Sequence, residues 1–343
     1  MNNFQIRKSG SAALLLTLTL MSVPAFAEID LSGNWATREH QDWMERSPGP
    51  EVVDYSGIPI NDEARTVGLS YMASALSLPE RQCLWYSPPY MVLGPFPHRI
   101  WAINDPVTGK IVAWQTQATI DRYGLTIWMD GRPHPGKDAP HTFGGFTTGE
   151  WDGNVLTTYT THMKAGYIRR NGLPNSDEAT VTMHFIRHGD LLTVSEHVED
   201  PIYLTEPYVV SHTWQLDPAT PIAATPIPCM PSAEVPRLEG EGDVPHYLPG
   251  KNPFLNEVSQ MYHIPVEAVM GGAETTYPEY RKKMKAGYVP PEKCVRYCCG
   301  WENNAAAAAL KDCIGRGFAS PEEPNGRNGD TAVVGPVVQP GAK

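Results

Sequence analysis

Residues 98–216 carry the pattern that most constrains the fold. Short runs rich in Val, Ile, Thr, Trp and Tyr alternate with turn residues about every 8 to 15 positions, which is typical of antiparallel strands joined in chain order. The pair Asp152-Gly153 predicts a tight hairpin that pairs Trp151 with Asn154, because Asp-Gly favours positive φ angles. His188-Gly189-Asp190 predicts the next hairpin. We therefore expect a mainly β protein, built as an antiparallel barrel or meander.

Alternation assigns the side chains of the last three predicted strands to two faces, since neighbours on a strand point to opposite sides. In the predicted register Ser195 lies near His212, and His197 lies one pair along. The face that we expect to be inside carries Val181, Met183, Phe185, Leu191, Thr193, Ser195, His197, Tyr208, Val210, His212 and Trp214. The opposite face carries Thr182, His184, Glu196, Ser211, Thr213 and Gln215.

Residues 1–27 have the form of a secretory signal peptide. Arg7 and Lys8 precede an apolar run at 12–21 and the small-residue pattern Ala25-Phe26-Ala27. No other stretch approaches the roughly 18 apolar residues that a membrane helix needs, so we expect a periplasmic or secreted protein without an integral membrane segment. The formal net charge of −11 argues against nucleic acid as a partner. The expected partner is a small molecule, and the oligomeric state stays open.

The rest of the chain is predicted to divide into four parts. A β-barrel domain at 28–217, whose N-terminal excursion holds a helix at 61–76, precedes a Pro-rich linker at 218–250. A helical, Cys-rich appendage follows at 251–318, and a disordered tail at 319–343. The helical patterns of the appendage cover 252–262, 277–285 and 292–316.

The six cysteines are expected to form disulfides, because their number is even in a chain bound for an oxidising compartment. Their clustering suggests one long link and two bridges among the last four, although the sequence does not determine the pairing. Metal binding by Cys294, Cys298 and Cys299 is the rival interpretation. The cysteines are Cys83, Cys229, Cys294, Cys298, Cys299 and Cys313.

The stretch 125–135, LTIWMDGRPHP, is a strand-like run that ends in charged residues. Function concentrates where a rigid strand meets a loop, and Arg132 can bind an oxyanion while His134 titrates near neutral pH. The alternative is a tight turn in which Asp130 pairs with Arg132. Alternation places Asp130 outside the barrel, so we expect it to brace the turn and leave Arg132 and His134 to reach a pocket mouth.

His197 and His212, with Ser195 and Tyr159 as neighbours, form a second candidate site. Two inward imidazoles can serve as general acid and base, or hold a metal with a third ligand. The alternative is that both are hydrogen-bonded core residues. His162 and His141 are further candidates, and His162 is expected to approach Arg132. The chain has no Gly-x-Ser-x-Gly elbow, phosphate-binding Gly loop or dinucleotide motif, so we expect neither a serine hydrolase nor a cofactor.

Four motifs together resemble a set of uncharacterised secreted bacterial proteins: 129–135 (MDGRPHP), 151–156 (WDGNVL), Thr160-Thr161 and Glu199-Asp200-Pro201. The resemblance covers about residues 31–229, and it implies a lipocalin-like (calycin-like) barrel and a disulfide between Cys83 and Cys229. The chain departs from the set by having Tyr159 in place of an acidic residue, and Met183-His184-Phe185 in place of Glu-Arg-Phe. A carboxylate mechanism is therefore not expected.

The leading functional hypothesis is an enzyme that acts on a small hydrophobic or aromatic metabolite by general acid-base chemistry, of isomerase, lyase or hydratase type. Arg132 would bind or polarise an oxygen, while His134, His197 or His212 would carry protons. Tyr159 would donate a hydrogen bond. The first alternative is a non-catalytic carrier or scavenger of an apolar ligand, and the second is a structural envelope protein.

Overall fold

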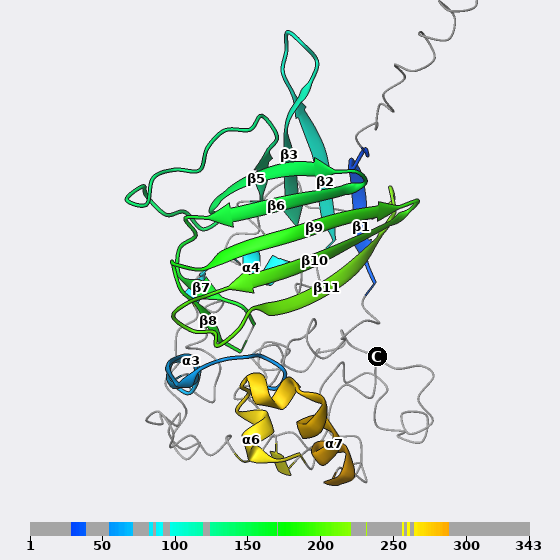
Figure 1. Cartoon of the computed structure of the whole chain (residues 1–343). Helices are drawn as coiled ribbons and strands as arrows, with labels where there is room; N and C mark the ends of the chain where they lie inside the picture. Colours follow the sequence, from blue (N-terminus) through cyan, green and yellow to red (C-terminus); the bar gives the residue numbers. More distant parts are fainter. Residues whose placement is uncertain are drawn as a thin grey trace, which may run out of the picture.

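Nine strands close into a β-barrel within the part of the chain that the structure, a computed structural model, describes (Figure 1). The described residues are 29–38, 55–70, 82–84, 87–91, 97–118, 124–169, 171–220, 231, 256, 259–260 and 264–287. The barrel strands are β1 (Gly33–Thr37), β2 (His98–Asn104), β3 (Ile111–Ala118), β4 (Thr126–Trp128), β5 (Phe146–Asp152), β6 (Val155–Thr161), β9 (Thr180–His188), β10 (Leu191–Glu199) and β11 (Tyr208–Leu216). The prediction of a mainly β barrel is confirmed.

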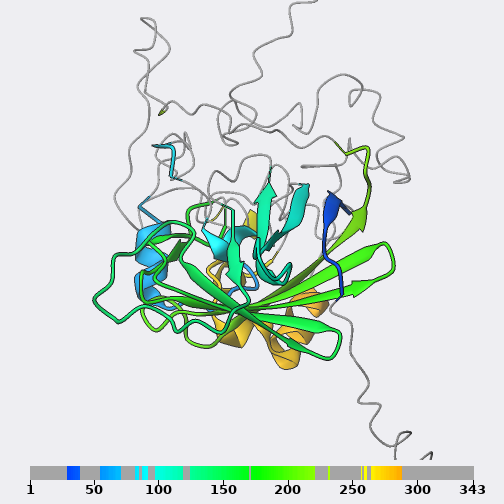
Figure 2. The same ribbon diagram turned by 90° about the horizontal axis from the view of Figure 1, so that it is seen from above.

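The barrel closes at β1, which pairs with the last strand on one side and with β2 on the other. Trp35 lies opposite Leu216 of β11 and opposite His98 of β2, and Figure 2 shows the dark blue β1 beside the yellow-green β11. The side chain of Trp35 is fully buried, and its Nε1 donates to the Leu31 carbonyl at 3.0 Å. This tryptophan therefore anchors the closing strand in the core.

One strand pair departs from the antiparallel prediction. β4 and β5 are parallel, with Ile127 opposite Thr147 and Trp128 opposite Thr148, so the barrel is mixed. Parallel neighbours need a crossover of about a dozen residues or more, and residues 129–145 provide it. Alternation reveals that a segment is a strand but not the direction of its partner, which is why the sequence prediction was wrong here. The motif with Arg132 and His134 lies in this crossover.

Both predicted hairpins form, but the first turn lies one residue later than predicted and the second turn is one residue shorter. Asp152 pairs with Val155, and His188 pairs with Leu191, so Gly153 and Gly189 each open a two-residue turn. Both glycines have a positive φ, 58° and 60°, which is the conformation that glycine adopts without steric cost.

The second turn decides which face of β10 is inside. Since the turn is one residue shorter than expected, Leu192, Val194, Glu196 and Val198 point inward with Met183 and Phe185. The predicted inward placement of Ser195 and His197 is wrong, because a shift of one residue moves every side chain to the other face. Ser195 lies opposite Ser211, and Val194 rather than Ser195 lies opposite His212. The inward assignments on β9 and β11 are confirmed.

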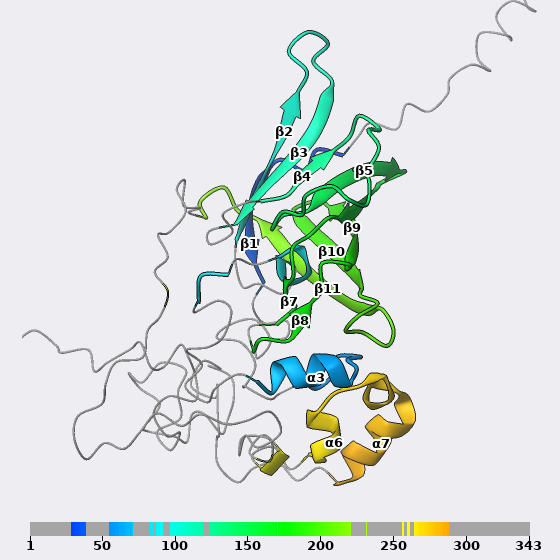
Figure 3. The same cartoon turned by 90° about the vertical axis from the view of Figure 1, so that its left-hand side faces the viewer.

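Helices lie at the end of the barrel away from the projecting β2–β3 hairpin (Figure 3). The short helix α4 (Pro88–Met91) and the two-stranded sheet of β7 (Gly166–Tyr167) and β8 (Pro174–Asn175) belong to the barrel part. At the far end lie α3 (Asp62–Gly68), α6 (Val266–Val269), the 3-10 helix η4 (Ala273–Thr276) and α7 (Pro278–Gly287). None of the helices formed by described residues is long and apolar enough to cross a membrane.

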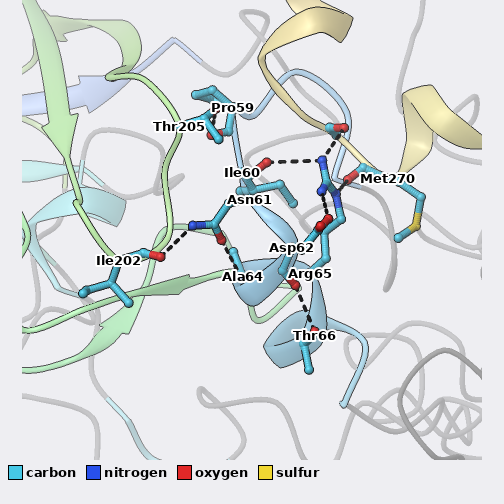
Figure 4. Close-up of polar contacts among 11 residues, drawn as sticks. Pro59, Ile60, Asn61, Asp62, Ala64, Arg65, Thr66, Ile202, Thr205 and Met270 are labelled. Carbon is cyan, nitrogen blue, oxygen red and sulfur yellow. Dashed lines mark hydrogen bonds and ion pairs between the residues drawn. The ribbon is translucent and has the colours of Figure 1, made fainter.

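Helix α3 connects the barrel to the C-terminal helices (Figure 4). Asn61 caps the helix by accepting from the Ala64 N–H at 3.0 Å, and its amide donates to the Ile202 carbonyl at 2.7 Å. Arg65 Nε donates to the Met270 carbonyl at 2.9 Å. The predicted helix start at 61 is confirmed by the Asn61 cap, but the helix ends at Gly68, before the predicted end at 76. Residues 71–76 lie outside the described residues. Helix α7 confirms the helical pattern at 277–285.

Hydrogen bonding explains the Asp200 of the Glu199-Asp200-Pro201 motif. The buried carboxylate of Asp200 accepts four hydrogen bonds: from the N–H and hydroxyl of Ser176 at 2.7 and 2.8 Å, and from the N–H groups of Ile202 and Tyr203 at 2.9 and 3.2 Å. It therefore holds the segment after β8 against the turn after β10.

Several predictions concern parts of the chain that are not described. The signal peptide, nearly all of the linker, the helical pattern at 292–316 and the tail lie outside the described residues. Cys83 is not a free thiol, but the other cysteines are outside the described ranges. The pairing of Cys83 with Cys229 and the disulfides of the appendage stay predictions.

Candidate functional site

Asp130 and Arg132 form a tight ion pair at the start of the crossover. Arg132 Nε donates to Asp130 Oδ1 at 2.8 Å and Nη2 donates to Oδ2 at 2.5 Å, while Gly131 takes a φ of 71°. These hydrogen bonds from Arg132 lower the pKa of Asp130 to about 2. The guanidinium carbon lies 3.5 Å from the centroid of the Trp128 ring. The prediction that Asp130 braces the turn is confirmed. Arg132 is not left free as expected but pairs with Asp130, as in the tight-turn alternative, and this pair holds it in one orientation.

His134 is held by hydroxyl groups on both ring nitrogens. Its Nδ1 lies 2.8 Å from Thr161 Oγ1 and its Nε2 lies 2.9 Å from Thr148 Oγ1. The ring packs against Phe146 and Tyr159, with centroid distances of 5.1 and 5.2 Å. Burial, and then the nearby His162, lower the pKa of His134 below its ordinary value. The site therefore favours the neutral imidazole.

His162 contacts the same threonine as His134, and His141 packs against His162. His162 Nδ1 is 2.7 Å from the same Thr161 hydroxyl, and its Nε2 is 3.0 Å from the Gly136 carbonyl oxygen. The ring of His141 lies 5.1 Å from that of His162. His162 has a φ of 56°, which is uncommon for a residue other than glycine. Such strain is often found at functional sites.

The direction of each hydrogen bond follows from the Gly136 carbonyl, which can only accept. His162 Nε2 therefore donates to it, and in the neutral ring Nδ1 accepts from the Thr161 hydroxyl. Thr161 has one proton to give, so it accepts from Nδ1–H of His134. The neutral His134 then accepts at Nε2 from the Thr148 hydroxyl. Thr148, His134, Thr161 and His162 thus form one directed chain of hydrogen bonds.

This chain begins at a groove on the outer wall of the barrel. The groove has a volume of about 1060 Å³ and is lined by Arg132, Thr148 and Tyr159, together with Glu150, Asp152 and Thr182. Tyr159 is 44% exposed. The structure therefore brings three of the five predicted site residues, Arg132, His134 and Tyr159, to one place.

The other two predicted site residues lie elsewhere. His197 is on the outer wall, where Tyr159 pairs with Thr182 and Thr182 pairs with His197. Two strand spacings, about 10 Å, separate it from Tyr159. His197 Nε2 lies 3.4 Å from Ser195 Oγ, and its ring is 5.4 Å from that of His184. His212 is fully buried inside the barrel, 4.4 Å from the ring of Trp214. The wall of the barrel separates it from the groove.

Glu196 is a buried group that the sequence prediction placed outside. It is fully buried, and no described residue donates a hydrogen bond to either carboxyl oxygen. Burial raises the pKa of Glu196 well above its ordinary value, so the fold favours the protonated carboxyl. The two-residue turn at Gly189-Asp190 was the sequence signal that would have placed it inside.

The barrel interior is filled by side chains. A cavity of about 30 Å³ lies between His98, Thr116 and Trp214, among apolar neighbours. This volume is far below the roughly 300 to 1,000 Å³ of ordinary ligand pockets. No group of three or more His, Cys, Asp or Glu side chains in the described ranges is placed to hold a metal ion.

Comparison with protein-family models, with curated proteins and with solved structures finds no match for the chain. The function is therefore argued from the groove itself.

Proposed function

We propose that the protein is a periplasmic or secreted enzyme that acts on a small hydrophobic or aromatic molecule by general acid-base chemistry. The reaction is of isomerase, lyase or hydratase type, and it takes place in the outer groove. The single observation that carries the proposal is the position of His134, hydrogen-bonded at Nε2 to a groove-lining hydroxyl and at Nδ1 to a chain that ends at a carbonyl. A positioned imidazole of this kind can contribute about 100-fold to 10,000-fold in rate.

The neighbours of His134 supply the other functions. Tyr159 offers an exposed ring for an aromatic substrate and a phenol that can donate a hydrogen bond. Arg132 keeps its positive charge and a fixed orientation over Trp128, so it can polarise a substrate oxygen. His197 and His212 are left out of the proposed site because of their positions.

The carrier hypothesis is less well supported by the geometry. A carrier that holds an apolar ligand inside the barrel needs an interior cavity, and the one described has a volume of about 30 Å³. Ligand pockets usually measure about 300 to 1,000 Å³, which is the size of the outer groove. Membership of the lipocalin-like family, which the motifs suggest, is likewise a proposal.

The test uses two probe reactions with the purified protein. Exchange of the α-hydrogens of phenylacetaldehyde in D₂O, followed by NMR, reports proton transfer at carbon, and opening of styrene oxide to its diol reports addition of water. We expect at least one reaction to exceed the buffer rate and to be lost in His134→Gln. The exposed His188→Gln is the matched control. If neither reaction depends on His134, the proposal is wrong.

A further inference from the structure

Thr148, not His134, is the member of the hydrogen-bonded chain that lines the groove. Both ring nitrogens of His134 already face threonine hydroxyls, at 2.8 and 2.9 Å. A molecule in the groove meets the hydroxyl of Thr148, which lies on the outer side of β5 opposite Tyr159. A proton that leaves the groove along this chain must therefore pass through Thr148.

We propose that Thr148 is the catalytic residue that contacts the substrate, and that the site adds water to small aromatic or aliphatic epoxides. The inference rests on the proposed function and selects its hydratase branch. A threonine hydroxyl is a very weak base, so it cannot remove a proton from carbon on its own. It can pass a proton between oxygens if it receives one from water while giving its own to an imidazole.

The proposed step balances as follows. The oxygen of a water molecule attacks one epoxide carbon, and the ring C–O bond breaks with its electron pair going to the ring oxygen. The water proton moves to Thr148 Oγ1 while the Thr148 proton moves to His134 Nε2, which lies 2.9 Å away. The ring oxygen takes the phenolic proton of Tyr159, and the proton on His134 returns to Tyr159 through solvent. The net reaction is epoxide plus water giving a diol.

The remaining members of the chain stabilise the charge that arises on His134. When Nε2 gains a proton, Nδ1–H still donates to Thr161, whose own proton is directed at His162. The excess proton is thus shared with a second imidazole, which is anchored on the Gly136 carbonyl. The strained φ of 56° at His162 is consistent with a ring that the chain requires at this position.

The alternative is a structural role, in which threonine and histidine side chains simply satisfy each other on the barrel wall. The two interpretations differ in what Thr148→Ser and Thr148→Val do. Serine keeps the hydroxyl, whereas valine keeps the shape and the β-branched preference for a strand but has no proton to pass. Thr193→Val is the matched control. Thr193 is also a strand threonine with a hydrogen-bonded hydroxyl, 2.9 Å from Thr213 Oγ1, but it does not line the groove.

The experiment measures diol formation from styrene oxide in H₂¹⁸O, with the melting temperature as a check on folding. We expect wild type, Thr148→Ser and Thr193→Val to form ¹⁸O-labelled diol, and Thr148→Val to lose about 100-fold or more. His134→Gln should lose a similar factor, which keeps the proposal testable if the valine variant does not fold. The rate of the active variants should rise with pH as His134 loses its proton.

Three outcomes overturn the inference in distinguishable ways. If folded Thr148→Val forms diol at the wild-type rate, Thr148 is structural. If styrene oxide is not opened but His134-dependent exchange of phenylacetaldehyde is seen, the proposed function stands and the choice of water addition is wrong. If neither probe reacts, the proposed function is wrong and the inference falls with it.

Discussion

Arg132 lies with its guanidinium carbon 3.5 Å from the centroid of the Trp128 ring while two of its nitrogens bind Asp130. The aromatic face and the carboxylate hold the cation from different sides. This arrangement makes Asp130 a reporter of the position of Arg132.

We predict that Arg132→Gln raises the pKa of Asp130 from about 2 towards its ordinary value, because hydrogen bonds from Arg132 are the main cause of the lowering. An Asp with a lowered pKa stabilises the fold above the unfolded pKa, and this stabilisation disappears as pH falls from about 4 through 2. NMR titration of the Asp130 carboxyl carbon measures the change. Arg99→Gln is the control, since Arg99 also lies over a tryptophan ring, Trp101. An unchanged Asp130 titration would contradict the assignment.

Glu196 predicts an unusual dependence of stability on pH. The unfolded chain releases this proton above about pH 4.3, whereas burial keeps it bound in the folded barrel. The wild type should therefore lose stability as pH rises from about 4.3 towards the raised folded pKa, by about 1.4 kcal/mol for each pH unit in that window.

Glu196→Gln should remove this slope, so urea unfolding at pH 5 and pH 8 should show a larger gain for the variant at pH 8. The exposed Glu199→Gln, on the same strand, should leave the pH dependence as it is. If the free energy of unfolding changes with pH in the same way for wild type and Glu196→Gln, the buried carboxyl does not keep its proton and the prediction is wrong.

His134 should titrate below the ordinary histidine range of about 6.5. His162→Gln should raise the midpoint only in part, because burial is the larger cause and His162 the smaller. A histidine whose folded pKa is lowered stabilises the fold above the unfolded pKa, and this is lost as pH falls below it. The midpoint is measured from the chemical shifts of the His134 imidazole in two-dimensional NMR spectra recorded over a range of pH. A midpoint at or above 6.5 would contradict the prediction.

Asp200→Ala should destabilise the barrel by about 2 to 4 kcal/mol, because it leaves several buried donors without an acceptor. Chemical unfolding of the variant measures the loss. Asp217→Ala is the matched control, since Asp217 accepts hydrogen bonds only within an exposed turn at 217–220, and it should cost well under half as much. If Asp200→Ala and Asp217→Ala lose the same free energy of unfolding, the buried hydrogen bonds of Asp200 do not stabilise the barrel more than those of an exposed turn.

Local interactions were the predictable part of this molecule. The strand pattern at 98–216 and the turn at Asp130 depend on neighbours in the chain, and both were predicted correctly. The inner face of β10 was predicted wrongly. A turn one residue shorter than expected moves every side chain of the strand to the opposite face of the sheet. Glu196 and His197 therefore exchanged faces.

The candidate site depends on contacts that alternation does not encode. Thr148 and Thr161 meet His134 only because the chain crosses over between parallel strands, and strand direction cannot be read from which residues alternate. The sequence pointed to Arg132, His134 and Tyr159 by residue type and by motif. It did not reveal that a threonine hydroxyl stands between the imidazole and the groove.

The parallel pair between β4 and β5 has a further consequence for how the barrel opens. With two residue pairs it is the shortest ladder among the described barrel strands, and local opening begins where the fewest hydrogen bonds hold. The groove is lined by residues from both sides of this seam, Arg132 just after β4 and Thr148 on β5. A molecule bound there would contact both β4 and β5, the barrel strands with the fewest residue pairs between them. Binding in the groove should therefore stabilise the closed barrel, and the closed barrel should bind the molecule more tightly.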